Sequence, residues 1–132
     1  MAVDASVAFK WLLEEEGSEE AIHHAAETTL IAPTLIWAEV GNALWKKVRR
    51  GEIDSAAARL AFGSLASFIG QWHDLEGLAE PAFDLAIELG HPIYDCYYLA
   101  LAETYDVELL TADLRLIESC RNTRFDVRLR RL

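Results

Sequence analysis

The fold is decided by the stretch from residue 30 to residue 50, which reads LIAPTLIWAEVGNALWKKVRR. Its first three residues are apolar and predict a short buried strand, which Pro33 ends. Thr34 is a good helix-capping residue, and apolar side chains recur at helical spacing from there to Arg50. A short apolar strand that leads directly into an amphipathic helix is typical of α/β proteins with a parallel sheet.

The same alternation continues on both sides of this stretch. Further strands are predicted at residues 1–4 and 107–111, with shorter candidates at 74–76 and 125–128. Helices are predicted at residues 6–16, where Ser6 is the expected cap, and at 19–29, 55–71, 79–89, 95–105 and 113–120. Because helices separate the strands, we expect a parallel sheet covered on both faces, with functional residues beyond the carboxyl ends of its strands.

Length and composition are those of a single globular domain over residues 1–132. Apolar residues make up 52% of the chain, which is enough to bury a core. Two cysteines cannot form a disulfide framework, and no signal peptide or membrane span is evident, so we expect a cytoplasmic protein. The net charge of −10, from 12 Lys and Arg against 22 Asp and Glu, excludes a broadly basic surface for nucleic acid.

A group of acids does not resemble ordinary surface charge, because each lies at a strand exit or in the first turns of a helix. The group consists of Asp4, Glu39, Asp95 and Asp113. Taken singly, the aspartates could be helix caps or turn residues, whereas a lone Glu in an apolar stretch needs a partner. Gathered at one sheet edge, the carboxylates would repel and raise each other's pKa unless a cation lay among them.

The chemistry of these ligands favours particular metals and a particular reaction. They offer oxygen atoms only, with no cluster of Cys and His, so Mg²⁺ or Mn²⁺ is favoured over Zn²⁺. Acidic clusters that bind such ions commonly serve phosphoryl chemistry, in which the metal activates water and neutralises charge on the phosphate. An acidic protein of this kind can therefore still cut nucleic acid.

These residues and their flanks resemble the PIN-domain ribonucleases, and more narrowly the VapC-type toxins of type II toxin–antitoxin systems. The segments that carry the resemblance are VDASV at 3–7, PTLIWAEVGNAL at 33–44, HPIYD at 91–95 with LALA at 99–102, and LTADLRL at 110–116. They extend over nearly the whole chain. One departure is that only three residues precede Asp4, which predicts a short first strand and a less firmly held Asp4.

The resemblance implies a three-layer α/β/α domain with a central, mostly parallel sheet. It implies an endoribonuclease that uses one or two Mg²⁺ or Mn²⁺ ions, with Asp4, Glu39, Asp95 and Asp113 as the catalytic, metal-binding acids. Ser6, Thr111 and Asn42 match positions near that site and are candidate supporting residues. The implied partners are an RNA substrate, a small cognate antitoxin and a second copy of the chain in a homodimer.

Other interpretations stay open at this point. The chain could be a PIN-like nuclease in RNA processing or DNA cleavage, or a non-catalytic module whose acids bind an arginine-rich protein. His91 is expected to be a turn residue before Pro92. Two basic segments, residues 46–50 and 121–132, could steer RNA towards the acids or could simply be solvated helix ends and tail.

Overall fold

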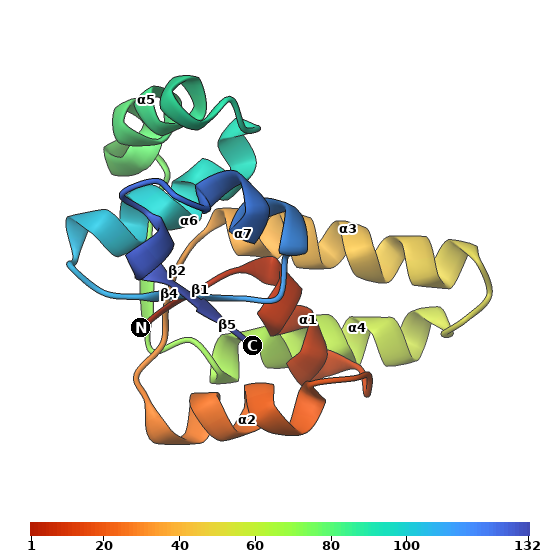
Figure 1. The fold of residues 1–132 in the computed structure, drawn as a ribbon. Coiled ribbons are helices and arrows are strands. Elements are labelled where there is room, and N and C mark those ends of the chain that lie inside the picture. The colour runs from red at the N-terminus through yellow and green to blue at the C-terminus, as the bar shows by residue number, and fades with distance from the viewer.

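The computed structural model describes all residues, 1–132, and contains one five-stranded sheet with the strand order β3-β2-β1-β4-β5 (Figure 1). The strands are β1 (Ala2–Val3), β2 (Ile31–Pro33), β3 (Gln71–His73), β4 (Leu109–Thr111) and β5 (Leu129–Arg131). All neighbouring strands are parallel, and central β1 places Ala2 opposite both Ile31 and Leu109. The predicted parallel sheet is confirmed.

Helices cover both faces of the sheet. They are α1 (Ala5–Leu12), α2 (Ser18–Glu27), α3 (Leu35–Arg49), α4 (Ser55–Ser64), α5 (Ala79–Leu89), α6 (Ile93–Thr104) and α7 (Leu114–Cys120). Helices α5, α6 and α7 lie on one side of the sheet and α1, α2 and α4 on the other, while α3 and α4 extend outwards as an antiparallel pair (Figure 1). This is the expected three-layer α/β/α arrangement. None of the helices has both the length and the apolar character needed to span a bilayer.

The core lies between the sheet and the helices on each face. Helix α6 is its main contributor, because Cys96 and the run from Tyr98 to Ala102 are all buried. The central strands are short and apolar. Helices cover both faces of the sheet and fully bury Ala2, Val3, Leu109 and Leu110.

Several predicted elements are wrong in position, among them the helix predicted at 6–16, which ends at Leu12. The helix predicted at 55–71 ends at Ser64, and the strand predicted at 74–76 forms earlier, at Gln71–His73. A close approach explains this: a Cβ on Gly70 would lie 2.8 Å from Thr29 Cγ2, so the chain must already run beside β2 there. The last strand forms later than predicted, because residues 126–128 make a 3₁₀ turn and β5 follows it.

Candidate functional site

The candidate site lies at the carboxyl edge of the sheet, where β1 and β4 end side by side. From central β1 the chain builds β2 and β3 on one side, and β4 and β5 on the other. In open α/β sheets this reversal of direction leaves a crevice beyond the strand ends, where ligands bind. Asp4 directly follows β1, and Thr111 is the last residue of β4.

Asp4 is the most firmly held of the candidate acids. It is 4% exposed and caps α1, with Oδ1 accepting from the backbone N–H groups of Ser6 at 3.0 Å and Val7 at 3.2 Å. The Ser6 hydroxyl also donates to Oδ1, and the Thr111 hydroxyl donates to Oδ2. The cap of α1 is therefore Asp4, not Ser6 as predicted, and the two-residue strand before it does not loosen its side chain.

Ser6 and Thr111 also connect Asp4 to the segment that carries Asp113. Ser6 Oγ accepts from the Ala112 N–H at 2.8 Å, and Thr111 Oγ1 accepts from the Asp113 N–H at 3.0 Å. Asp113 caps α7, because its Oδ1 accepts from the Arg115 N–H at 2.8 Å. The structure thus brings Asp4, Ser6, Thr111 and Asp113 together at the ends of β1 and β4.

Glu39 reaches the site from the second turn of α3 and is held by a residue that the sequence analysis did not single out. The buried Tyr98 hydroxyl donates to Glu39 Oε2. Tyr98 lies three residues after Asp95 on α6, so the two side chains share one face of that helix. This spacing was the one sign in the sequence that Tyr98 lies near the acids. Asn42 lies almost one turn beyond Glu39, is exposed, and has no hydrogen bond to the acids.

Asp95 lies in the first turn of α6 and contacts His91. The distance from His91 Nε2 to Asp95 Oδ2 is 2.6 Å, and His91 Nδ1 lies 2.8 Å from Ser119 Oγ on α7. Because a carboxylate can only accept, the Nε2–H of His91 donates to Asp95. The His91 side chain is 8% exposed, so it is a built-in partner of Asp95 and not only a turn residue.

The acids influence one another electrostatically. Burial raises the pKa of Asp4 to about 6, against hydrogen bonds that lower it, and the Asp95 carboxylate raises it further. Burial also raises the pKa of Glu39, to which the charges of Asp95, Asp4 and Asp113 add, while the Tyr98 hydrogen bond lowers it. The Glu39 carboxylate therefore lies within electrostatic range of the other three acids, of which only Asp4 is buried.

The donor chemistry of this region suits a hard divalent cation. Every candidate ligand is a carboxylate oxygen, and repulsion among them is what a cation would relieve. In the conformation of this structure no three Asp, Glu, His or Cys side chains converge on one metal position. Hydroxyl and imidazole groups contact the carboxylates of Asp4, Glu39 and Asp95 instead.

Comparison with known proteins agrees with this geometry. The family model described as the PIN domain matches residues 1–121. The chain belongs to the PIN-domain family. It is 35% identical over 121 residues to Ribonuclease VapC3 of Pyrobaculum aerophilum, a match that covers 89% of this chain and 92% of that relative.

Solved structures give the same family fold. PAE2754 of Pyrobaculum aerophilum is 28% identical and superposes with a TM-score of 0.67, over 92% of this chain and 80% of that one. The VapBC2 complex of Rickettsia felis, bound to a DNA fragment from its promoter, has a chain of the same fold with a TM-score of 0.70. That likeness covers 99% of this chain and 97% of the other at 13% identity, which shows the fold alone.

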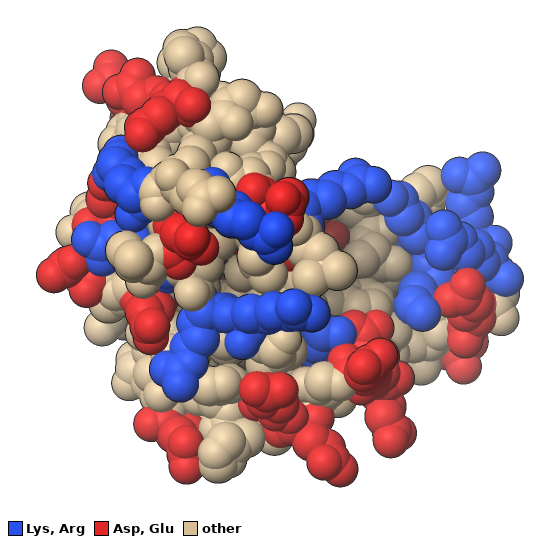
Figure 2. All heavy atoms as spheres, in the orientation of Figure 1, with Lys and Arg blue, Asp and Glu red and all other residues tan.

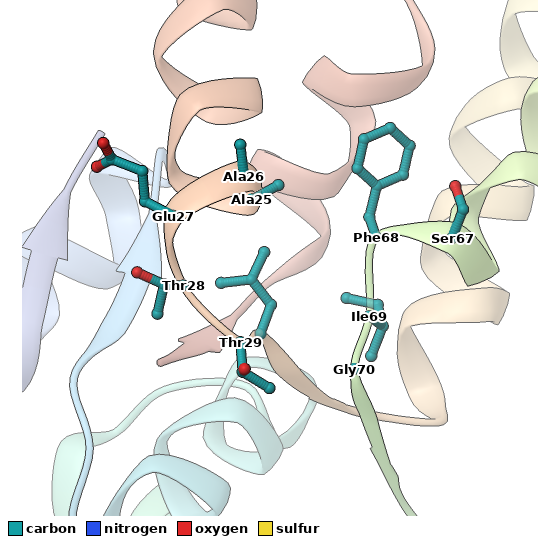
Figure 3. Close-up of a pocket in the computed structure, with 10 residues that line it drawn as sticks. Ala25, Ala26, Glu27, Thr28, Thr29, Ser67, Phe68, Ile69 and Gly70 are labelled. Atoms are coloured by element: carbon teal, nitrogen blue, oxygen red, sulfur yellow. The ribbon is translucent and has the colours of Figure 1, made fainter.

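A pocket elsewhere on this PIN domain is separate from the acids. It has a volume of about 320 Å³ and is lined by residues 25–30 and 67–70 (Figure 3). These residues precede or begin β2 and β3, so the pocket lies at the amino edge of the sheet, opposite Asp4. Its one charged lining residue, Glu27, pairs with His23, and the pocket offers no group of reactive side chains.

The basic residues of the PIN domain divide into paired and free cations. Four of the five arginines in residues 121–132 form ion pairs: Arg121 with Glu118, Arg124 with Glu88 and Glu103, Arg128 with Asp106, and Arg130 with Glu108. The cations with no carboxylate within ion-pairing distance are Lys46, Arg49, Arg59, Arg115 and Arg131. Basic side chains gather over the outer end of α3 and the turn into α4, with a second band near β5 (Figure 2).

Proposed function

We propose that this PIN-domain protein is a metal-dependent endoribonuclease that hydrolyses RNA phosphodiester bonds as the toxin of a toxin–antitoxin pair. The observation that carries the proposal is geometric: Asp4 and Asp113 follow the neighbouring parallel strands β1 and β4, cap the helices after them and are joined through Thr111. A relative named a VapC ribonuclease, matched over nearly its whole length, supports the same activity.

In this proposal Asp4, Glu39, Asp95 and Asp113 hold one or two Mg²⁺ or Mn²⁺ ions. A metal held there would supply activation of water and neutralise charge on the attacked phosphate. Oxygen-only donors support this choice over zinc.

The remaining side chains keep the acids in position. Ser6 and Thr111 hold the two oxygens of Asp4 so that the carboxylate stays at the strand ends. Tyr98 holds Glu39, and His91 orients Asp95 while Ser119 fixes the other side of its ring. Asn42 is a supporting residue only in a conformation in which it turns towards the substrate.

The proposed protein partners are a small cognate antitoxin and a second copy of the chain. An arginine of the antitoxin is electrostatically suited to the acidic edge, where it would take the position of the cations. The homodimer is proposed to use the apolar surface of α5 and α6, because Phe83, Ile87 and Tyr94 are exposed there. Light scattering of the purified protein measures this: a monomer mass at micromolar concentration contradicts the homodimer.

The activity is tested with purified protein and a mixed panel of single-stranded RNA and DNA in Mg²⁺ or Mn²⁺. We expect cleavage of RNA that EDTA stops, and loss of cleavage in Asp4→Asn and in Asp95→Asn. The matched control is Asp84→Asn, an exposed aspartate on α5, which keeps full activity. The DNA arm separates an enzyme restricted to RNA from one that also cuts DNA. Equal cleavage by all three variants rejects the site, and absence of RNA cleavage rejects the function.

A further inference from the structure

One face of α3 carries polar and aromatic side chains outwards from the acidic site. Glu39, Asn42, Lys46 and Arg49 follow one another at intervals of three, four and three residues, so they lie along one side of the helix. Trp45 lies beside Lys46 on this exposed side. We call Asn42, Trp45, Lys46 and Arg49 the α3 track. It begins next to Glu39 and ends near the turn into α4.

Trp45 differs from the other three tryptophans. Trp11 stacks on Phe68 at 4.9 Å between ring centroids, and Trp37 stacks on Trp72 at 5.3 Å, so these rings pack in the body of the domain. Trp45 is 53% exposed and has no aromatic partner, and only the Arg49 guanidinium lies over its ring, 5.4 Å from the centroid. Its ring is therefore available to a ligand.

The charge of the α3 track favours a polyanion. No carboxylate lies within ion-pairing distance of Lys46 or Arg49, and the Glu52 carboxylate is paired with Lys47 at 3.1 Å and Arg50 at 4.0 Å. Two unpaired cations next to an exposed indole are a combination that binds single-stranded nucleic acid, through phosphate contacts and base stacking. An apolar protein partner would not need the two uncompensated charges.

The spacing fits an RNA strand that runs from the acidic site outwards along α3. Six residues separate Trp45 from Glu39, which is about 9 Å along a helix at 1.5 Å per residue. That is close to the length of about three stacked nucleotides at ~3.4 Å each. We propose that the α3 track binds the single-stranded RNA that flanks the cleaved bond, with Trp45 stacking on a base and Lys46 and Arg49 contacting phosphates. This inference rests on the proposed ribonuclease function and adds a substrate subsite to it.

The test measures RNA binding apart from cleavage. Fluorescence anisotropy with a short fluorescein-labelled single-stranded RNA of mixed sequence is recorded in the Asp4→Asn background, so that the probe stays intact. We expect Trp45→Ala to weaken binding about tenfold and Trp45→Phe, which keeps an aromatic ring, to retain most of it. Tyr105→Ala, which removes an exposed aromatic ring elsewhere, is the matched control and binds like its parent.

The charges are tested by the salt dependence of the same binding. Lys46→Gln with Arg49→Gln is expected to reduce the slope of log affinity against log salt by roughly 1.4, or about 0.7 for each lost phosphate contact. Arg121→Gln with Arg124→Gln removes two ion-paired arginines and leaves the slope unchanged. Circular dichroism checks that each variant is folded.

The outcomes separate this inference from the proposed function. If the unsubstituted protein cleaves RNA but Trp45→Ala binds the probe as tightly as its parent, the α3 track is rejected and the function stands. If the Trp45→Leu variant binds the probe as tightly as the Trp45→Phe variant, base stacking at this position is rejected. If Trp45→Ala binds RNA normally but changes the oligomeric mass, the face is a protein interface and the inference is wrong. If the unsubstituted protein neither cleaves nor binds RNA, both proposals fail.

Discussion

At the scale of single residues, Asp4 combines burial with a full set of hydrogen bonds. Both of its oxygens accept from donors on α1 or β4, yet its pKa is raised from 3.8 to about 6 because burial outweighs those bonds. A carboxyl group whose pKa is higher in the folded than in the unfolded state destabilises the fold when it is ionised. The cost is fully present above about pH 6 and disappears as the pH falls below 3.8.

Asp4→Asn is therefore expected to stabilise the metal-free protein. A difference from 3.8 to about 6 corresponds to an order of 3 kcal/mol between the ionised and the protonated carboxyl at pH 7, which is an upper bound on the gain, and the gain should shrink steadily as the pH is lowered from 6 towards 4. Urea unfolding in EDTA at several pH values measures it. Asp84→Asn is the control and should change little. A destabilised Asp4→Asn at pH 7 would show that the hydrogen bonds of the carboxylate dominate its burial.

Tyr98 affects the site through Glu39. Its hydrogen bond lowers the pKa of Glu39, so Tyr98→Phe should raise that pKa further. The acidic limb of the pH profile for RNA cleavage is then expected to move to higher pH, with the fold retained because the ring stays in place. A profile that only loses height, with no displacement, would assign Tyr98 a purely structural role.

At the scale of elements, the α3–α4 pair depends on a close contact at Gly41. A Cβ there would lie 3.2 Å from Phe62 Cε2, and Phe62 also packs edge-on against Trp37 at 5.0 Å. Gly41 lies two residues after Glu39 on α3. The contact with Phe62 therefore helps to fix the position of Glu39 relative to the sheet edge.

We expect Gly41→Leu to destabilise the protein by about 1–3 kcal/mol and to reduce cleavage, since overpacking forces the two helices apart. Gly63→Leu on α4 is the matched control, because nothing lies within 4 Å of a Cβ at that position. It should be neutral or slightly stabilising, as glycine is a poor helix former. Denaturant unfolding of both variants provides the comparison, and equal stabilities would reject the packing argument.

The elements also show what could be predicted from the sequence. Helix α3 and the places of the acids at strand exits and in the first turns of helices were predictable, because a strand exit followed by an apolar helix leaves few places for an isolated carboxylate. The end of α4 and the start of β3 were not, since the close approach of Gly70 to Thr29 is a tertiary contact between segments far apart in the chain. Tyr98 was missed because its bond to Glu39 joins residues 59 positions apart. The contact of His91 could have been predicted, because its partner Asp95 lies only four residues later in the chain.

At the scale of the whole molecule, the net charge of −10 has two components. Part of the acidic surface is matched by arginines in residues 121–132, which are largely ion-paired. The acids at the sheet edge have no such partners, and repulsion among them is a global cost to the fold.

A divalent cation should therefore stabilise the folded protein. Binding to the folded state alone adds about 2.7 kcal/mol at a hundredfold excess over Kd, so Mg²⁺ or Mn²⁺ should raise Tm and EDTA should reverse the rise. Asp95→Asn should lose most of the increase, whereas Asp84→Asn should keep it. Scanning calorimetry at constant ionic strength measures the effect. An equal rise in both variants would mean that the ions act on general surface charge.

The bond between Thr111 and Asp4 also bears on when activity can arise during synthesis. It joins residues 107 positions apart, and β4 must insert beside β1 before it can form. A nascent chain that already contains Asp4, Glu39 and Asp95 still lacks the strand that orients Asp4 and the helix that Asp113 caps. Translation must pass residue 113 before the proposed site is complete, so a chain stalled earlier on the ribosome is expected to be inactive.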